Sequence, residues 1–180
     1  MKRYIYKQLL AWKNEKEHKP LILNGARQVG KTYILREFGR NEYKRMAFFS
    51  LDRDQKALEI FNKGGRATDM LMALSAICHE DITPHDTLVV LDEIQNCPKA
   101  LEALKFFCEE TPEIDIVVAG SLLGLSIHSG VSYPVGKVEE LHLYPMTFLE
   151  FLEAMGKTQL VNLLENKNWT VINMLETELI

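Results

Sequence analysis

Residues 19–32 read Lys-Pro-Leu-Ile-Leu-Asn-Gly-Ala-Arg-Gln-Val-Gly-Lys-Thr, and this stretch decides the fold. The run 19–24 is short and almost entirely apolar, which is typical of a buried central strand. The run 25–32 fits the pattern G-x-x-x-x-G-K-[ST], whose glycines let backbone N–H groups curl around phosphate groups. A helical pattern follows over residues 31–38, so the positive end of a helix would face the same anion.

The loop predicts a phosphate and metal site. Lys31 would carry a mobile positive charge to the β- and γ-phosphates, a catalytic role, and the Thr32 hydroxyl can ligate Mg²⁺. The alternative is an ordinary glycine turn with a solvated lysine and threonine. The expected nucleotide-binding residues are Gly25, Ala26, Arg27, Gln28, Val29, Gly30, Lys31 and Thr32.

A second motif follows another apolar run, residues 87–91, with the pair Asp92-Glu93. Asp92 would hold Mg²⁺ directly or through water, and Glu93 would orient and deprotonate an attacking water. A phosphoryl transfer to a bound acceptor does not need this base, so the pair points to hydrolysis. Taken alone, an acidic pair after a strand is most often a solvated turn.

A third apolar run, residues 114–119, ends in Gly120-Ser121. Ser121 could sense the γ-phosphate or position water, since ligands gather at the carboxyl ends of parallel strands. The alternative is a serine that caps a helix. Guanine recognition would normally need Asn-Lys-x-Asp, and both Asn-Lys pairs, at 62–63 and 166–167, lack the aspartate. GTP is therefore disfavoured as the substrate.

Strand-like and helical patterns alternate along the chain, which predicts an α/β fold with a parallel sheet. Further strands are expected at 46–50 and 138–143. Thr147 with Glu150 three residues later forms a capping box that predicts a helix start. Other helices are expected at 5–13, 55–61, 68–78 and 98–109.

Composition excludes several classes of protein. The 180 residues carry a net charge of −4, so a simple nucleic-acid-coating protein is disfavoured. Residues 1–66 hold 16 basic and 7 acidic residues, including all seven arginines, and the remainder is acidic. We find no apolar run long enough for a membrane span, which needs about 18 residues. Three cysteines without C-x-x-C spacing indicate reduced thiols and a cytoplasmic protein.

These motifs together resemble one family of prokaryotic AAA-domain ATPases, over about residues 4–154. The resemblance is carried by residues 25–32, by Leu-Asp-Glu-Ile-Gln at 91–95, by Ala-Gly-Ser at 119–121, and by the stretches 134–139 and 143–151. It implies a P-loop NTPase core of the AAA/ASCE type, with a five-stranded parallel sheet sandwiched by helices, that uses ATP and Mg²⁺. It also implies that Asp92 is the Walker B acid, Glu93 the base and Ser121 the sensor.

Two features depart from that family. Its members usually carry a further C-terminal domain of unknown function, so this chain resembles the N-terminal core alone. We expect an ATPase core at 1–156 and a helical tail at 157–180, as the start of a truncated or missing second domain. Many such ATPases also use an arginine late in the core, whereas none follows Arg66 here. Lys137 is the nearest substitute. Otherwise Arg27, Arg53 or Arg66 acts across a subunit boundary, or the arginine belongs to the missing domain.

The favoured hypothesis is an ATPase whose hydrolysis drives a conformational change in a protein partner or missing domain. One alternative is a nucleotide-binding switch with little or no hydrolysis. Another is a nucleic-acid-associated ATPase. The tail places apolar residues at helical spacing. These helices either pack onto the core or leave an apolar face for the missing domain or a second copy of the chain, which would favour a homo-oligomer.

Overall fold

The computed structural model describes residues 3–121 and 133–174. They form two compact units. The larger is Ile5–Tyr144, and the smaller joins the N-terminal residues up to Tyr4 to the segment that begins at Pro145. Each unit is described by itself.

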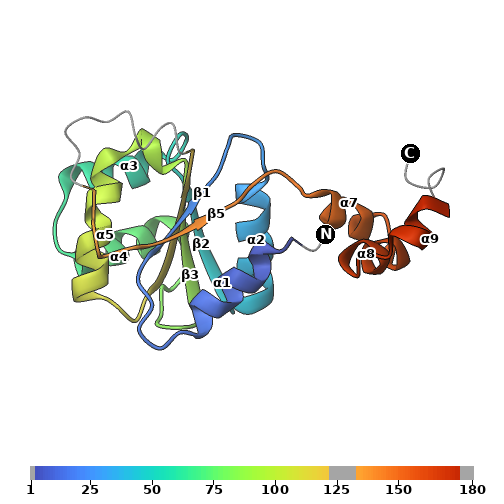
Figure 1. The fold of residues 1–180 in the computed structure, drawn as a ribbon. Coiled ribbons are helices and arrows are strands. Elements are labelled where there is room, and N and C mark those ends of the chain that lie inside the picture. Colours follow the sequence, from blue (N-terminus) through green and yellow to red (C-terminus); the bar gives the residue numbers. More distant parts are fainter. Residues whose placement is uncertain (1–2, 122–132, 175–180) are drawn as a thin grey trace. The chain divides into compact units, whose positions relative to one another are not determined.

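The larger unit is built on a parallel sheet of five strands in the order β2-β3-β4-β1-β5 (Figure 1). Every neighbouring pair is parallel. The strands are β1 (Leu21–Asn24), β2 (Arg45–Ser50), β3 (Thr87–Asp92), β4 (Asp115–Gly120) and β5 (Glu139–His142). The predicted five-stranded parallel sheet is therefore confirmed.

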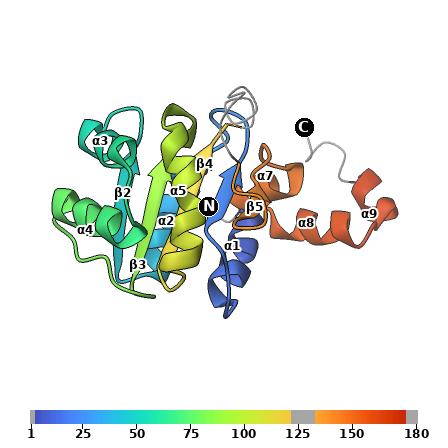
Figure 2. The same ribbon diagram turned by 90° about the vertical axis from the view of Figure 1, so that its left-hand side faces the viewer.

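Helices cover both faces of this sheet. Helices α1 (Ile5–Asn14) and α2 (Lys31–Glu42) pack on one face, and α3 (Gln55–Lys63), α4 (Ala67–Cys78) and α5 (Pro98–Glu110) pack on the other. In Figure 2, α5 crosses in front of the sheet and α2 lies behind it. A short 3₁₀ turn, η1 (Ile94–Asn96), follows β3.

The central strands are apolar on both sides because both sides are buried. All residues of β1, β3 and β4 are buried. Within β3, Leu88 and Val90 face the core under α1 and α2, whereas Val89 and Leu91 face the core under α3–α5. This explains why these strands appear in the sequence as unbroken apolar runs and not as alternating patterns.

Helix α2 continues to Glu42, beyond its predicted end at residue 38. Glycine has a low intrinsic helix propensity, so the sequence around Gly39 does not predict this extension. A Cβ at this position would lie 2.4 Å from the Met46 sulfur, so the glycine makes room for β2 against the helix. Tertiary packing therefore overrides the local preference.

The smaller unit contains α7 (Phe148–Ala154), α8 (Thr158–Glu165) and α9 (Trp169–Met174). The predicted capping box at Thr147 and Glu150 is present, with both reciprocal hydrogen bonds. Glu150 also accepts hydrogen bonds from the Tyr4 backbone N–H (2.7 Å) and from Arg3 Nε (3.1 Å). Burial alone would raise the pKa of Glu150, but these donors outweigh it and lower that pKa.

Among the residues described, no helix combines the length and apolar character that a membrane crossing requires. All three cysteines are free thiols.

A buried ion pair ties the loop before β1 to the start of β4. His18 Nε2 lies 2.7 Å from Asp115 Oδ1, and its Nδ1 lies 2.9 Å from the Glu15 carbonyl oxygen. The side chains of His18 and Asp115 are 8% and 3% exposed. The hydrogen bond to Asp115 raises the pKa of His18, although burial acts in the opposite direction.

The His18→Ala substitution should lower the free energy of unfolding by about 1–3 kcal/mol near pH 5.5, the range for hydrogen bonds to charged groups. Because the folded-state pKa is raised above the unfolded value, this contribution is complete below that unfolded value. It fades as the pH rises through the folded-state pKa. Urea unfolding at pH 5.5 and 8.5 measures it, with the exposed His85→Asn as control. An equal loss at both pH values would contradict the ion pair.

Candidate active site

The carboxyl ends of β1, β3 and β4 meet at one edge of the sheet. Asn24, the last residue of β1, pairs with Gly120 at the end of β4, and β4 pairs with β3 on its other side. The chain segments that follow these three strands therefore lie next to one another. Such an edge, where the connections leave in opposite directions, is where open α/β sheets bind ligands.

The loop after β1 takes a shape that its glycines permit. A Cβ on Gly25 would lie 2.4 Å from the Leu143 backbone oxygen, so no other residue fits without a backbone shift. Gln28 and Gly30 have positive φ values of 64° and 97°. Helix α2 then begins at Lys31 with no side-chain cap, so its first N–H groups and its positive dipole end are available to an anion.

The Lys31 ammonium is held inside this loop. Its Nζ donates hydrogen bonds of 2.9 Å to the backbone oxygens of both Gly25 and Ala26. Burial lowers the pKa of Lys31, while the negative charges of Glu93 and Asp92 act to raise it. The lysine is thus a buried cation placed close to the two carboxylates that the sequence singles out.

Thr32 and Asp92 are in direct contact. Thr32 Oγ1 donates a 2.7 Å hydrogen bond to Asp92 Oδ2, and Asp92 Oδ1 accepts a 3.1 Å hydrogen bond from the Glu93 backbone N–H. The Asp92 residue is 4% exposed. A hydroxyl and a carboxylate oxygen at this separation fit Mg²⁺, which takes oxygen ligands and keeps waters and substrate phosphates as its remaining ligands. No cluster of three or more His, Cys, Asp or Glu side chains suited to a metal occurs in the described ranges.

Glu93 follows Asp92 in an unusual backbone conformation, with φ at 57°. A positive φ is uncommon for a residue other than glycine and is found disproportionately at functional sites. The side-chain amide of Gln95, in η1, donates a hydrogen bond to Glu93 Oε2. The Glu93 carboxylate is half-buried and oriented by this amide, a partner that the sequence analysis did not identify.

The remaining predicted residues differ in their placement. Ser121 directly follows Gly120 at the same sheet edge and is 7% exposed. Arg27 is exposed on the loop. Lys137 Nζ lies 2.9 Å from Glu109 Oε1, so its charge is paired with that carboxylate.

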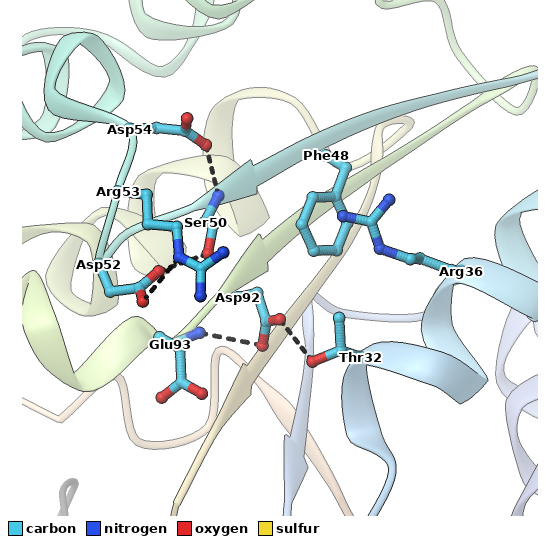
Figure 3. A pocket seen from close by; sticks show the side chains of 9 residues that line it. All are labelled: Thr32, Arg36, Phe48, Ser50, Asp52, Arg53, Asp54, Asp92 and Glu93. Carbon is cyan, nitrogen blue, oxygen red and sulfur yellow. Dashed lines mark hydrogen bonds and ion pairs between the residues drawn. The ribbon is translucent and has the colours of Figure 1, made fainter.

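A pocket of about 460 Å³ opens beside Thr32, Asp92 and Glu93 (Figure 3). Its other lining residues come from α2, β2 and the turn after β2. These residues are Arg36, Phe48, Ser50, Asp52, Arg53 and Asp54. Of these the sequence analysis considered only Arg53, as an arginine acting across a subunit boundary. The position of these residues depends on the pairing of β2 with β3, which sets Ser50 opposite Asp92. No local sequence motif predicts this pairing.

The parallel sheet and the loop after β1 define a P-loop NTPase fold. A family model described as "AAA domain" matches residues 17–152, and the chain belongs to this family. No curated protein matches it.

A chain in a structure of Drosophila ORC bound to DNA is similar, with a TM-score of 0.54 and 15% sequence identity. The similarity covers 86% of the present chain and 46% of that chain, so the present chain spans less than half of its length. At this identity the likeness shows the fold.

The Gly25→Ala substitution should destabilise the larger unit by about 1–3 kcal/mol, the usual cost of overpacking, because its Cβ meets rigid backbone. Gly39→Ala is the matched comparison and should cost less, because its Cβ meets the Met46 side chain, which can change its rotamer, and no backbone atom. Chemical unfolding of both variants provides the comparison. A Gly25→Ala variant as stable as the wild type would show that the loop does not depend on this close approach.

Proposed function

We propose that this chain binds ATP together with Mg²⁺ and hydrolyses it. The observation that carries the proposal is the direct contact of Thr32 with Asp92, beside the buried Lys31 ammonium. It joins the phosphate-binding loop to the acidic end of β3, so a metal bound there would touch both halves of the site. The lack of an Asn-Lys-x-Asp motif favours ATP over GTP.

Each residue then has a defined task. The backbone N–H groups of residues 25–30 and the start of α2 bind the phosphates, and Lys31 moves from the loop oxygens to the β- and γ-phosphates. Thr32 and Asp92 would hold Mg²⁺, which when bound neutralises phosphate charge. Glu93 accepts a proton from the attacking water. Ser121 would contact the γ-phosphate or position that water.

The contacts of Leu143, the residue directly after β5, support coupling of this cycle to the rest of the protein. The Leu143 N–H donates a 2.7 Å hydrogen bond to the Asn24 backbone oxygen, and the Leu143 carbonyl oxygen packs against Gly25. The chain enters the smaller unit two residues later, at Pro145. A shift of the phosphate-binding loop would therefore act directly on the segment that leads into the smaller unit, and through it on a partner or a further domain.

The Lys31→Ala substitution should weaken ATP binding at least 10-fold, or about 1.4 kcal/mol, because it removes the one buried cation of the loop. Calorimetric titration with ATP and Mg²⁺ measures this. Lys16→Ala, which removes an exposed lysine of the α1–β1 connection, is the control. Unchanged affinity of the Lys31→Ala variant would contradict the assignment of the phosphate site.

The Glu93→Gln substitution should reduce phosphate release by about 10²-fold or more, the usual contribution of a general base, and leave ATP affinity within a few-fold of the wild type. The amide keeps the shape of the side chain and removes its basicity. Phosphate release and ATP binding are measured on the same preparation. Equal turnover by the variant and the wild type would remove Glu93 as the base.

The same measurements distinguish two other functions from the proposed one. A wild-type chain that binds ATP and releases no phosphate is a nucleotide-binding switch. Phosphate release that rises on addition of DNA or RNA at low salt identifies a nucleic-acid-associated ATPase, because phosphate contacts weaken as salt increases.

A further inference from the structure

The pocket beside the P-loop holds two of the seven arginines in this chain. Arg36 and Arg53 share its lining with Thr32, Asp92 and Glu93. In the view of Figure 3 the two guanidinium groups lie on either side of the Asp92 carboxylate, that of Arg53 beside Asp52 and that of Arg36 against the Phe48 ring. The question left by the sequence, which arginine serves an ATPase with none after Arg66, therefore has two local candidates.

Arg36 is already engaged. Its guanidinium lies 3.8 Å from the centre of the Phe48 ring, a cation–π contact that holds the group against β2. Of the other arginines weighed from the sequence, Arg66 forms two hydrogen bonds to Asp69, at 3.1 and 3.2 Å. Arg27 does not line the pocket.

Arg53 is carried by a firmly built turn. The Leu51 N–H donates a 2.9 Å hydrogen bond to the Asp92 backbone oxygen, and this bond holds the turn against the end of β3. The Ser50 backbone oxygen accepts hydrogen bonds from the backbone N–H groups of both Arg53 (2.9 Å) and Asp54 (2.8 Å). Asp54 in return accepts a 2.6 Å hydrogen bond from the Ser50 N–H. The backbone of Arg53 is thus fixed beside the segment that carries Glu93.

The side chain of Arg53 is held far less firmly than its backbone. It is 83% exposed, and its Nε lies 3.4 Å from Asp52 Oδ2. The Asp52 carboxylate is itself fixed by a 2.5 Å hydrogen bond from the Ser50 hydroxyl. Exposed ion pairs contribute little energy, so the guanidinium leaves Asp52 at small cost when a more negative group enters the pocket.

We propose that Arg53 is a catalytic residue supplied by the same chain, and that its guanidinium contacts the γ-phosphoryl group of bound ATP. This inference rests on the proposed function. During hydrolysis the water oxygen bonds to the γ-phosphorus while the bond to the β–γ bridging oxygen breaks. The electron pair stays on ADP, and Glu93 takes one proton of the water. Arg53 offsets the charge that spreads over the γ-oxygens and exchanges no proton.

The test compares Arg53→Ala and Arg53→Lys with Arg40→Ala, the control that removes an exposed arginine of α2 outside the pocket lining. Three quantities are measured: the turnover number, the affinity for a non-hydrolysable ATP analogue, and the affinity for ADP with aluminium fluoride, which imitates the transferring phosphoryl group. Arg53→Ala should lower turnover by about 10²-fold or more. It should weaken the aluminium fluoride complex to a similar extent and the ATP analogue by less than about three-fold.

Arg53→Lys should recover part of the loss, because it keeps the charge without the forked geometry. Arg40→Ala should match the wild type in all three quantities. Wild-type turnover and wild-type binding of ADP with aluminium fluoride by Arg53→Ala would overturn the proposal. Turnover of the wild-type chain is measured first. If the wild-type chain shows none, the proposed function is wrong, and the variants are not compared.

A mixing experiment tests whether Arg53 acts within its own chain. Arg53→Ala and Glu93→Gln chains are combined in equal amounts. If Arg53 reached across a subunit boundary, the second chain would lend its arginine to the intact Glu93 of the first, and turnover would return. The proposal requires that the mixture stays as inactive as its components, and recovered turnover would overturn it.

Discussion

The hydrogen bond between Thr32 Oγ1 and Asp92 Oδ2, 2.7 Å long, joins two segments that lie 60 residues apart in the chain. It forms because β4 separates β1 from β3 in the sheet and all three run in the same direction. Their carboxyl ends then deliver the P-loop, the acidic pair and Ser121 to one edge. The buried Lys31, the strained backbone of Glu93 and the pocket beside them depend on this arrangement, and so does any metal that would bind there.

The parts of this arrangement that are local in the sequence could be predicted from it. Lys31 and Thr32 follow a strand at the spacing a phosphate demands, and Asp92 and Glu93 end an apolar run, so each motif carries its own chemistry. Arg53 could not be assigned in this way. Its place depends on β2 pairing with β3 in the register that sets Ser50 beside Asp92, a long-range contact that no spacing rule encodes. The extension of α2 through Gly39 has the same origin, because packing against Met46 outweighs helix propensity.

The electrostatics of the site follow from a crowding of opposite charges in a small space. Two carboxylates, Asp92 and Glu93, lie close enough to Lys31 to offset part of the effect of burial on its pKa. The pocket adds two further carboxylates and two guanidinium groups, from the turn after β2 and from α2. The basic first third of the chain and the acidic remainder thus meet at one sheet edge. The site accounts for part of the lopsided distribution of charge, because Lys31, Arg36 and Arg53 come from the basic first third and Asp92 and Glu93 from the acidic remainder.

The most direct test of this account is phosphate release from ATP by the unmodified chain as Mg²⁺ is varied. A site in which Thr32 and Asp92 share a magnesium ion predicts release that rises to saturation with Mg²⁺ and stops when EDTA is added. Release that is equal in EDTA and in saturating Mg²⁺, or no release at any Mg²⁺ concentration, would contradict it.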